Sequence, residues 1–403
     1  MLARSVTLVL CDPDGRLLAQ TPPFVVERPW WQEVGDVVRA ARERWGLEVA
    51  VLRLLASERP RPPGGWVAYL AETERAGIQA SANLEPVSDE LRAAAQRSHG
   101  CRADWAMPGG HRDSLAWVQS VWLRGGDFEA RQQRAWNLAS LWRFEARGSG
   151  GEPSAWLKQV PPFLAHEQAV LSWLQATVAG VSPRILAGDG AGRMLIGHVA
   201  GDDCYGAPAD QRERFARVQH RVQLASIPAL EALARRGVPD RRGARLARHL
   251  RTQLAGRLAP FPRVERFVER LDDDLRRVEA CALPDVLVHG DFHPGNVRRD
   301  GDTVTILDWG DSFLGNPAFD CLRLCEGLEP EAAGRVLQRW SALWRQCRRN
   351  CQPERAVDLL RPLAPLRAAA TYAHFVAQIE DSEQPFHASD IGAQLELAER
   401  LLG

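Results

Sequence analysis

Two carboxylates and one amide, close together in the sequence, have side chains that could do chemistry as a group. Asp291 and Asn296 have four residues between them, and Asp308 follows soon after. One carboxylate can accept the proton of an attacking hydroxyl, while a second carboxylate and an amide oxygen can hold Mg²⁺ against nucleotide phosphates, because Mg²⁺ prefers oxygen ligands. These residues therefore favour phosphoryl transfer, with Asp291 as the base and Asn296 and Asp308 as metal ligands. The alternative is a solvated loop rich in turn-forming residues.

The residues around this set predict how it is positioned. The apolar run Val286–Val288 is expected to form a short strand that ends at the loop, and Thr303–Leu307 a second strand that ends at Asp308. The Asp300-Gly301-Asp302 turn precedes the second strand, and Asp-Gly supplies the positive φ angles of a tight hairpin. The strand ends, together with the His-Gly before Asp291 and the Trp-Gly after Asp308, make the solvated loop the weaker interpretation.

The segments HGDFHPGN and ILDWGD resemble motifs of the aminoglycoside phosphotransferase and choline kinase family, the small-molecule branch of the protein-kinase-like fold. The resemblance extends over residues 113–403. It implies an α+β, bilobal fold with a small β-rich N-lobe (113–199) and a mostly helical C-lobe (200–403). It also implies a kinase that uses ATP and Mg²⁺ to move the γ-phosphate to a hydroxyl of a small molecule, such as an antibiotic, an amino alcohol or a sugar.

The resemblance gives a role to the only lysine of the chain. Fifty arginines accompany this one lysine, Lys158, which lies in the predicted strand Ser154–Val160. In kinase-like folds the third strand carries the lysine that grips the nucleotide phosphates, and Lys158 stands at that place. A compact ammonium suits this task better than a planar guanidinium does. Glu167, on the next predicted helix, is expected to pair with Lys158; a solvated helix glutamate is the alternative.

Other nucleotide contacts follow from the resemblance as well. The turn predicted at Asn137–Ser140 would cover the phosphates, but it lacks the glycine-rich pattern of protein kinases. The Ser140 hydroxyl or the backbone amides of the turn are therefore expected to replace the glycine-rich loop. The adenine is expected to dock through backbone groups near Ile196–Val199, a stretch that contains Ile196 and His198.

Three residues are expected to support the catalytic loop. Asp320, which follows the Gly-Asn-Pro stretch after the metal turn, is expected to hold the loop by hydrogen bonds. His289 is expected to be a structural residue of the loop, because Asp291 already has the task of the base. Asp311 would support the metal site or face the substrate.

A cluster of acidic residues near the C-terminus offers a hint about the acceptor. Glu380, Asp381 and Glu383 fall in the part of the chain that forms the acceptor pocket in the family, and acidic groups there attract cationic substrates. The cluster indicates an amine-bearing acceptor, or else a solvated helix end.

Residues 1–112 are predicted to form a separate α+β domain with strands on both sides of one helix. That helix is expected from Trp31 to Trp45 and is ended by Gly46. A later helix is expected from Ser114 to Leu123, ended by Gly125-Gly126. The composition between the two parts is not linker-like, so the two domains are expected to pack together.

The stretch Arg39–Leu47 resembles a degenerate Nudix box, in which a helix presents several glutamates to divalent metals at a pyrophosphate. Glu43 fits the end of this motif, but Ala40 and Arg44 stand where two of its glutamates belong. One carboxylate cannot hold several metal ions, so the domain is predicted to be Nudix-like in shape and not a hydrolase. An amphipathic helix without family meaning is the alternative.

Composition limits the partners of the chain. The formal net charge is +0 and no apolar stretch reaches the length of a membrane span, so neither a nucleic acid nor a membrane is expected as a partner. Val6–Leu10 is interrupted by an Asp-Pro-Asp-Gly turn, which indicates a strand and not a signal peptide. The eight cysteines include two pairs spaced by four, Cys321/Cys325 and Cys347/Cys351. Reduced thiols in a cytoplasmic protein are favoured over a four-thiolate zinc site.

Two further functions compete with the kinase. One is a non-catalytic, nucleotide-binding module with a kinase-like fold, which the complete set of nucleotide and metal residues disfavours. The other is hydrolysis of nucleotide pyrophosphates by the N-terminal domain, which Ala40 and Arg44 disfavour.

Overall fold

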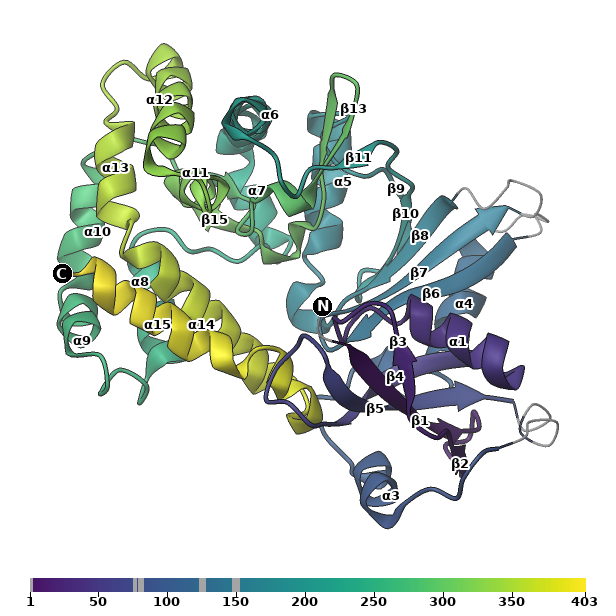
Figure 1. The fold of residues 1–403 in the computed structure, drawn as a ribbon. Helices are drawn as coiled ribbons and strands as arrows, with labels where there is room; N and C mark the ends of the chain where they lie inside the picture. Colours follow the sequence, from purple (N-terminus) through teal and green to yellow (C-terminus); the bar gives the residue numbers. More distant parts are fainter. Residues whose placement is uncertain (1–2, 75–77, 79–82, 123–127, 147–152) are drawn as a thin grey trace. The chain divides into compact units, whose positions relative to one another are not determined.

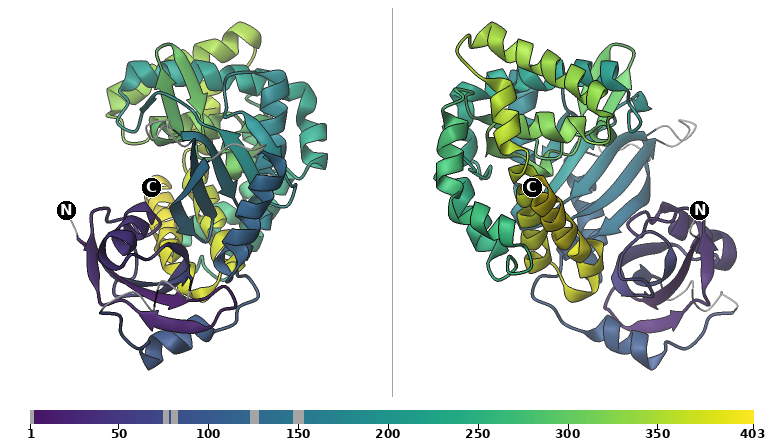
Figure 2. Two further views of the ribbon diagram at one scale, coloured as in Figure 1. Left: turned by 90° about the vertical axis from the view of Figure 1, so that its right-hand side faces the viewer. Right: turned by 60° about the vertical axis from the view of Figure 1, so that its left-hand side comes forward.

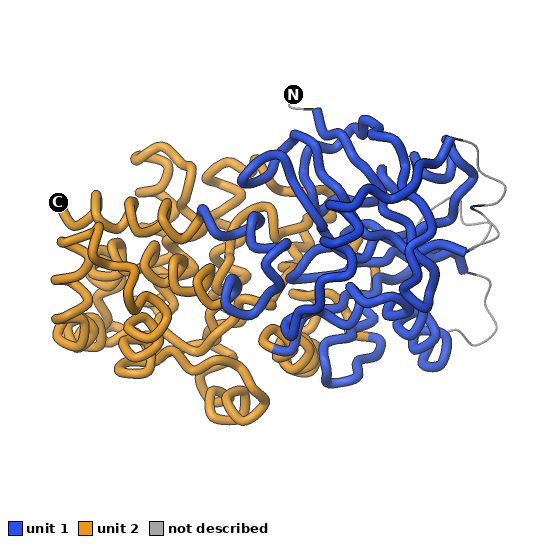
Figure 3. Tube along the Cα trace, turned by 90° about the horizontal axis from the view of Figure 1, so that it is seen from below, with its two compact units in different colours: residues 1–162, 186–197, 375–389 blue, residues 163–185, 198–374, 390–403 orange. Residues whose placement is uncertain are grey.

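The structure is a computed structural model that describes residues 3–74, 78, 83–122, 128–146 and 153–403 (Figure 1, Figure 2). The chain forms two compact units (Figure 3). Unit 1 comprises residues 1–162, 186–197 and 375–389, and unit 2 comprises residues 163–185, 198–374 and 390–403. The domain boundary expected near residue 112 stays a prediction.

The first sheet of unit 1 is a mixed sheet with strand order β2-β1-β5-β4, and β3 pairs with β1. Strands β1 and β5 run parallel, and the other pairs are antiparallel. Strands β1 and β4 are nearly continuous apolar runs, which suits strands buried on both faces. The strands are β1 (Arg4–Cys11), β2 (Leu17–Gln20), β3 (Phe24–Val26), β4 (Val49–Ser57) and β5 (Gly65–Thr73).

Helix α1 (Gly35–Trp45) begins later than the sequence predicted. The buried Arg4 guanidinium donates hydrogen bonds to three carbonyl oxygens ahead of the helix, those of Trp30, Trp31 and Glu33. Those carbonyls therefore bind Arg4 and do not start a helical ladder. The predicted end is confirmed, because Gly46 adopts a left-handed conformation with φ of 66° and its amide donates back into the last turn.

The second sheet of unit 1 has the order β6-β7-β8-β10-β9. The expected hairpin between β6 and β7 is present, but its turn is shorter than predicted. Trp136 pairs with Ala139, so only Asn137 and Leu138 form the turn and Ser140 belongs to β7. The strands are β6 (Phe128–Trp136), β7 (Ala139–Ala146), β8 (Pro153–Gln159), β9 (Ile185–Gly188) and β10 (Arg193–Gly197).

The two sheets of unit 1 share an apolar core. Ala50 of β4 packs in one cluster with Trp142 and Leu157 of the second sheet and with Val118 of helix α4 (Gly110–Val121). The side chain of Gln132 on β6 also bonds both backbone groups of Val51 on β4, at 2.8 and 2.7 Å. The expected packing between the two parts is therefore found inside unit 1. Short helices α3 (Asp89–Gln96) and η1 (Asp104–Ala106) lie between β5 and α4 in the sequence.

Helix α4 begins at Gly110 and not at Ser114, because the Met-Pro-Gly-Gly stretch before it already turns: Gly109 has a φ of 82°. The Gly125-Gly126 pair predicted to end the helix lies outside the described residues.

Unit 2 is mostly helical, as predicted for the C-lobe (Figure 1). Its helices are α5 (Glu167–Thr177), α6 (Ala209–Ser226), α7 (Leu230–Arg235), α8 (Ala244–Leu254), α9 (Pro262–Glu269), α10 (Leu271–Glu279), α11 (Ala318–Cys325), α12 (Pro330–Cys347) and α13 (Pro353–Leu360). Helices α14 (Leu363–Gln378) and α15 (Ala388–Leu401) begin or end in unit 2, and residues 375–389 between and within them belong to unit 1.

Short strands in unit 2 carry the segment with the candidate chemistry. β13 (Val297–Asp300) and β14 (Thr303–Ile306) form the expected hairpin, in which Gly301 has a φ of 55°. Strand β11 (Asp202–Asp203) pairs with β13, and β12 (Val286–Val288) pairs with β15 (Phe313–Gly315). The hairpin and the β12 strand thus place the two predicted loops at strand ends.

All eight cysteines are free thiols. Within the part of the chain that the structure describes, no group of three or more His, Cys, Asp or Glu side chains is placed to hold a metal ion. None of the helices in that part is long and apolar enough to cross a membrane.

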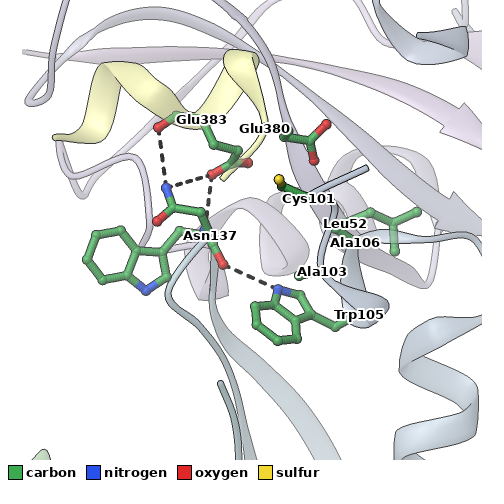
Figure 4. A pocket seen from close by; sticks show the side chains of 9 residues that line it. Leu52, Cys101, Ala103, Trp105, Ala106, Asn137, Glu380 and Glu383 are labelled. Atoms are coloured by element: carbon green, nitrogen blue, oxygen red, sulfur yellow. Dashed lines mark hydrogen bonds between the residues drawn. The ribbon is translucent and has the colours of Figure 1, made fainter. Parts of the chain in front are cut away.

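The acidic cluster near the C-terminus is neither a solvated helix end nor a free acidic patch. Glu383 is 2% exposed and accepts a hydrogen bond from the backbone amide of Leu54 at 2.7 Å. It also accepts from the backbone amide of Asn137 at 3.1 Å and from the Asn137 side chain (Figure 4). Glu380 accepts from Arg102 at 2.9 Å and forms an ion pair with Arg53 at 3.7 Å. Glu383 therefore joins the two sheets of unit 1, while Glu380 binds the first sheet and the segment between α3 and η1.

Glu383 gives unit 1 a stability that depends on pH. Burial raises the pKa of Glu383 to about 7, against the hydrogen bonds from Leu54 and Asn137, which lower it. The folded chain therefore holds the proton more tightly than the unfolded chain, whose value is near 4.5. The contribution of Glu383 to the free energy of unfolding is full below pH ~4.5 and is lost as the pH rises to ~7.

We predict that Glu383→Gln, which cannot titrate, flattens this dependence. Between pH 5 and 8 the stability of the wild type should fall relative to the variant by on the order of 3 kcal/mol, since each unit of pKa shift corresponds to about 1.4 kcal/mol. Urea unfolding of the wild type and the variant at several pH values measures this difference in stability. Asp381→Asn, an exposed change in the same turn, should behave as the wild type does. A difference between the wild type and Glu383→Gln that is constant with pH would contradict the prediction.

Candidate active site

Asp320 on α11 fixes the loop that follows β12. It accepts hydrogen bonds from the backbone amides of His289 and Gly290, both at 3.1 Å, and from the side chains of Gln219 (2.7 Å) and Gln223 (3.0 Å) on α6. Four donors thus satisfy a carboxylate that is 2% exposed. Burial raises the pKa of Asp320, while His289 and these donors act against the rise. The loop is tied by this one side chain to two helices.

Gly290 is required by the geometry of the same loop. Its φ is +87°, and a Cβ at this position would lie 2.1 Å from the backbone oxygen of Asp311. Any other residue would have to adopt a strained backbone and also collide with the turn after β14. The close approach brings the loop of Asp291 against the turn that carries Asp308 and Asp311.

His289 is buried between the loop and β14. Its Nε2 lies 2.8 Å from the backbone oxygen of Leu307, which can only accept, and its Nδ1 accepts from the amide of Asp291 at 3.3 Å. These partners assign a neutral imidazole with the proton on Nε2. Burial lowers the pKa of His289. Its ring packs on the Trp309 ring, with 4.6 Å between the ring centres. This environment suits a structural residue and not a proton carrier.

Asp291 accepts hydrogen bonds on both carboxylate oxygens. Arg323 Nε donates to Oδ1 at 2.8 Å, Asn296 Nδ2 donates to Oδ2 at 3.1 Å, and His293 Nε2 lies 3.4 Å from Oδ2. Burial acts to raise the pKa of Asp291, but the hydrogen bond from His293 and the charge of Arg323 outweigh it, and the pKa lies well below the ordinary range. Asp291 is therefore an oriented and ionised carboxylate.

Asn296 is oriented by Asp291. Its Nδ2 donates to both the backbone oxygen and Oδ2 of Asp291, at 3.0 and 3.1 Å. Since both partners can only accept, the amide nitrogen must face them, and the Oδ1 of Asn296 points away. The backbone oxygen of Asn296 accepts from Leu307 at 2.8 Å, which extends the hairpin by one pair and brings Asn296 beside the end of β14.

Asp308 is exposed at the end of β14 in a left-handed conformation, with φ of 60° and ψ of 67°. Such a backbone is costly for a residue other than glycine, and it is common at functional sites. The next amide, that of Trp309, donates to Glu167 Oε1 at 3.2 Å, and the Trp309 indole donates to Ile306. Glu167 is 1% exposed, so it is not a solvated helix glutamate. Glu167 instead holds the turn after Asp308.

The oxygen donors of this region fit a magnesium ion in type. The Oδ1 of Asn296 and the carboxylate of Asp308 are hard oxygen ligands of the kind that Mg²⁺ takes from proteins, where it keeps several waters and substrate oxygens in its remaining positions. Two protein ligands are enough for this mode of binding.

Three of the residues predicted to bind the nucleotide lie in the second sheet of unit 1. Lys158 is on the central strand β8, between Leu141 and Met194 of the neighbouring strands, and is 8% exposed. Ser140 is buried on β7, and Ile196 lies on β10.

His198 follows β10 and is exposed, in unit 2. Because Lys158 belongs to unit 1 and Glu167 to unit 2, their pairing stays a prediction. The Asn137 amide, one of those considered for phosphate, is bound to Glu383.

Two arginines near Asp291 were not found from the sequence. Arg323 lies three residues after Asp320 on α11, so the two side chains are on the same face of the helix. This spacing could have indicated from the sequence that Arg323 lies near the catalytic loop. Arg367 donates from α14 to the backbone oxygen of Gly290 at 2.7 Å. No local pattern could have revealed Arg367, because it comes from a distant helix.

In the predicted Nudix-like region, Glu43 is exposed on α1 and lies 4.0 Å from Arg39. Arg44 covers the ring of Phe24 at 5.4 Å. The resemblance of this region to Nudix proteins stays a prediction.

A family model described as the phosphotransferase enzyme family matches residues 143–353, just over half of the chain. The chain belongs to this family. The matched span contains Lys158, Asp291, Asn296 and Asp308, and it confirms the predictions of the family and of an enzyme that transfers phosphate. A search of curated proteins found no match.

Solved structures with the same fold include three from related kinases. A choline/ethanolamine kinase family protein from Mesorhizobium loti is 14% identical, with a TM-score of 0.52 and coverage of 72% of this chain and 94% of that chain. The GDP and kanamycin complex of APH(2")-IIia is 15% identical, with a TM-score of 0.51 and coverage of 72% of this chain and 98% of that chain. The Plasmodium vivax ethanolamine kinase Pv091845 is 12% identical, with a TM-score of 0.51 and coverage of 68% of this chain and 82% of that chain. The bilobal, kinase-like α+β fold is thereby confirmed.

We predict that Gly290→Ala disrupts the loop. The new Cβ would meet the Asp311 oxygen and impose a left-handed backbone on alanine, so the free energy of unfolding should fall by at least ~2 kcal/mol. Gly301→Ala offers a control, since Gly301 also has a positive φ but nothing lies within 4 Å of its added Cβ. Urea unfolding of both variants separates collision from backbone strain. Equal losses in the two variants would show that the contact with Asp311 does not matter.

Proposed function

We propose that the protein is a kinase that uses ATP and Mg²⁺ to transfer the γ-phosphate to a hydroxyl group of a small molecule. The observation that carries this proposal is the arrangement of Asp291, Asn296 and Asp308, in which an ionised carboxylate orients an amide beside a second, exposed carboxylate. Membership of the phosphotransferase family supports the reaction class. Two of the similar structures are a kanamycin complex and an ethanolamine kinase, which supports a small molecule with a hydroxyl as acceptor.

Asp291 would bind the acceptor hydroxyl and align it with the phosphorus atom. A carboxylate with a low pKa is a weak base, but the transition state of phosphoryl transfer is loose and asks little of a base before the bond to phosphorus forms. Most of the rate enhancement then comes from orientation of the hydroxyl. The hydrogen bonds from Arg323, Asn296 and His293 hold the carboxylate in one position for this task.

Asn296 Oδ1 and the carboxylate of Asp308 would hold the metal. Bound Mg²⁺ supplies positive charge against the phosphate oxygens as negative charge moves onto the leaving group. The left-handed backbone of Asp308, held by Glu167 through the Trp309 amide, keeps the carboxylate exposed at the strand end.

Lys158 would grip the nucleotide phosphates, and Glu167 would orient Lys158. The stretch with Ile196 and His198 would receive the adenine through backbone groups, and Ser140 would lie near the phosphates. His289, Asp311 and Asp320 would support the loop and the metal turn. One of the similar structures is a complex with GDP, which supports a nucleotide as phosphate donor.

We predict that Asp291→Ala lowers kcat by at least ~10²-fold, because the side chain orients the acceptor. Nucleotide binding should stay nearly intact, because the backbone oxygen of residue 291 still accepts from Asn296. The measurement is transfer of phosphate from ATP to a panel of hydroxylated compounds, with nucleotide binding followed by calorimetry. Asp302→Ala removes an exposed carboxylate from the nearby hairpin turn and should keep full activity. Unchanged turnover in Asp291→Ala would refute the assignment.

We predict that Lys158→Arg raises the KM for ATP by about tenfold, a loss of about 1.4 kcal/mol, although the charge is kept, since a guanidinium is larger and planar. The reverse exchange Arg131→Lys, at an exposed position of the same sheet, should leave the KM unchanged. Steady-state kinetics with varied ATP tests both variants. An unaltered KM in Lys158→Arg would mean that position 158 needs only a cation.

A further inference from the structure

Unit 2 contains a group of five basic side chains that the proposed reaction does not use, and we call it the basic cluster. Two of its members, Arg367 and His374, are seven residues apart on α14 and so lie on one face of that helix. The others come from three different segments of the chain. The members are His166, Arg241, His249, Arg367 and His374.

Strand β15 gives the two arginines of the basic cluster a common support. The backbone amide of Arg241 donates to the Leu314 oxygen at 2.9 Å. The guanidinium of Arg367 lies over the ring of Phe313, 5.3 Å from its centre, and over that of Phe319, at 5.8 Å. The backbone of Arg241 and the guanidinium of Arg367 therefore lie at neighbouring residues of one strand.

The charges of the basic cluster act on one another. Burial lowers the pKa of His249 to about 3, and the charges of Arg241, His374 and Arg367 add to this effect. Burial also lowers the pKa of Arg241, and the charge of Arg367 adds to it, against Asp240. The lowered pKa values leave the histidines neutral near pH 7, so the two arginines carry the positive charge of the basic cluster.

The basic cluster is short of anionic partners. Arg241 is half-buried, and its guanidinium forms no hydrogen bond or ion pair with the described residues, while the Nε of Arg367 is buried without a hydrogen-bond partner. The Nε2 of His166, a residue that is 9% exposed, is also buried without a hydrogen bond. The backbone groups of Ser312, Phe163 and Gly310 nevertheless lie close enough to raise the pKa of this ring against the effect of burial. The nearest carboxylate in sequence, Asp240, is already held by Arg242 and Arg245, each at 2.6 Å.

Carboxylates offset part of the charge on both arginines, and Asp240 is the one that acts on Arg241. Asp311, Asp291 and Asp320 raise the pKa of Arg367, although burial, the largest effect, lowers it. Arg367 donates its Nη2 to Gly290, the residue before Asp291. The basic cluster therefore begins next to the loop that would orient the acceptor.

Buried donors without partners are costly, and a bound oxyanion would satisfy them. A guanidinium matches the oxygen atoms of a carboxylate or phosphate group, and neutral histidines can add N–H donors. An amine-bearing group would be repelled from the same place. The acidic residues that first indicated an amine, Glu380 and Glu383, are engaged in unit 1.

We propose that the basic cluster binds an oxyanion of the acceptor, so that the substrate is a small alcohol that also carries a carboxylate or a phosphate group. This proposal rests on the proposed kinase function. The anionic group would be held between Arg241 and Arg367, and the hydroxyl would extend from there to Asp291.

Binding of inorganic phosphate to the full chain without nucleotide tests the anion site apart from catalysis. Phosphate should raise the melting temperature of the wild type and of Arg248→Gln, an exposed change one residue before His249 on α8. Arg241→Gln and His249→Gln should lose most of this shift. Two separate variants are used so that a folding defect in one of them does not decide the test. No shift in the wild type, or the same shift in Arg241→Gln, would overturn the proposal.

Matched acceptors test the substrate class. Glycerol 3-phosphate against glycerol and gluconate against glucitol separate a phosphate from a carboxylate, and choline and kanamycin represent cations. We expect transfer from ATP to the anionic member of a pair, with a KM that rises at least ~10-fold in Arg241→Gln, because the guanidinium binds the anionic group, while kcat stays within ~2-fold. Preference for the neutral or cationic compounds would overturn the proposal.

The two tests separate the two claims. A phosphate shift that depends on Arg241, without phosphorylation of any acceptor, would support the anion site and count against the kinase. Phosphorylation that is lost in Asp291→Ala but unaffected by Arg241→Gln would support the kinase and overturn the anion site.

Discussion

The candidate site depends on one buried carboxylate, Asp320, which accepts four hydrogen bonds. Two come from the backbone of the loop before Asp291, and two come from glutamines on α6. Without them the backbone amides of His289 and Gly290 would be buried without partners, which is costly for a loop. Gly290 can then approach the oxygen of Asp311 without a side chain in between. The positions of Asp291 and of the turn after Asp308 follow from these contacts.

Much of this arrangement could be predicted because its determinants are local in the sequence. The order strand, loop, hairpin and turn is encoded by apolar runs and an Asp-Gly turn, and the structure contains β12, β13 and β14 in that order. The helical unit 2 and the family also follow from local motifs. The left-handed backbone of Asp308 could not be foreseen, because propensity argues against it and only the contacts around Trp309 maintain it.

The features that sequence reasoning missed come from residues far apart in the chain. Helix α1 starts late because Arg4, some thirty residues earlier, binds the carbonyl oxygens before it. The acidic residues near the C-terminus were placed in an acceptor pocket, yet Glu383 binds Leu54 and Asn137 across more than two hundred residues of sequence. A cluster of like charges in a sequence does not reveal which opposite charges or amides will face it. Only the fold decides whether such a cluster binds a ligand or is buried in the interior of the protein.

Charge balance around Asp291 limits what kind of acceptor can bind. Asp291 and Asp308 are negative, and the phosphates of a nucleotide would add to that charge, so an anionic acceptor would be repelled unless cations offset the field. Arg323 is committed to Asp291, and Arg367 is partly committed to the carboxylates nearby. Arg241 is the cation of this region that these groups do not bind, and only Asp240 offsets its charge in part. A cationic or neutral acceptor would leave the half-buried Arg241 without an anionic partner from the substrate, whereas an acceptor with an oxyanion would supply one.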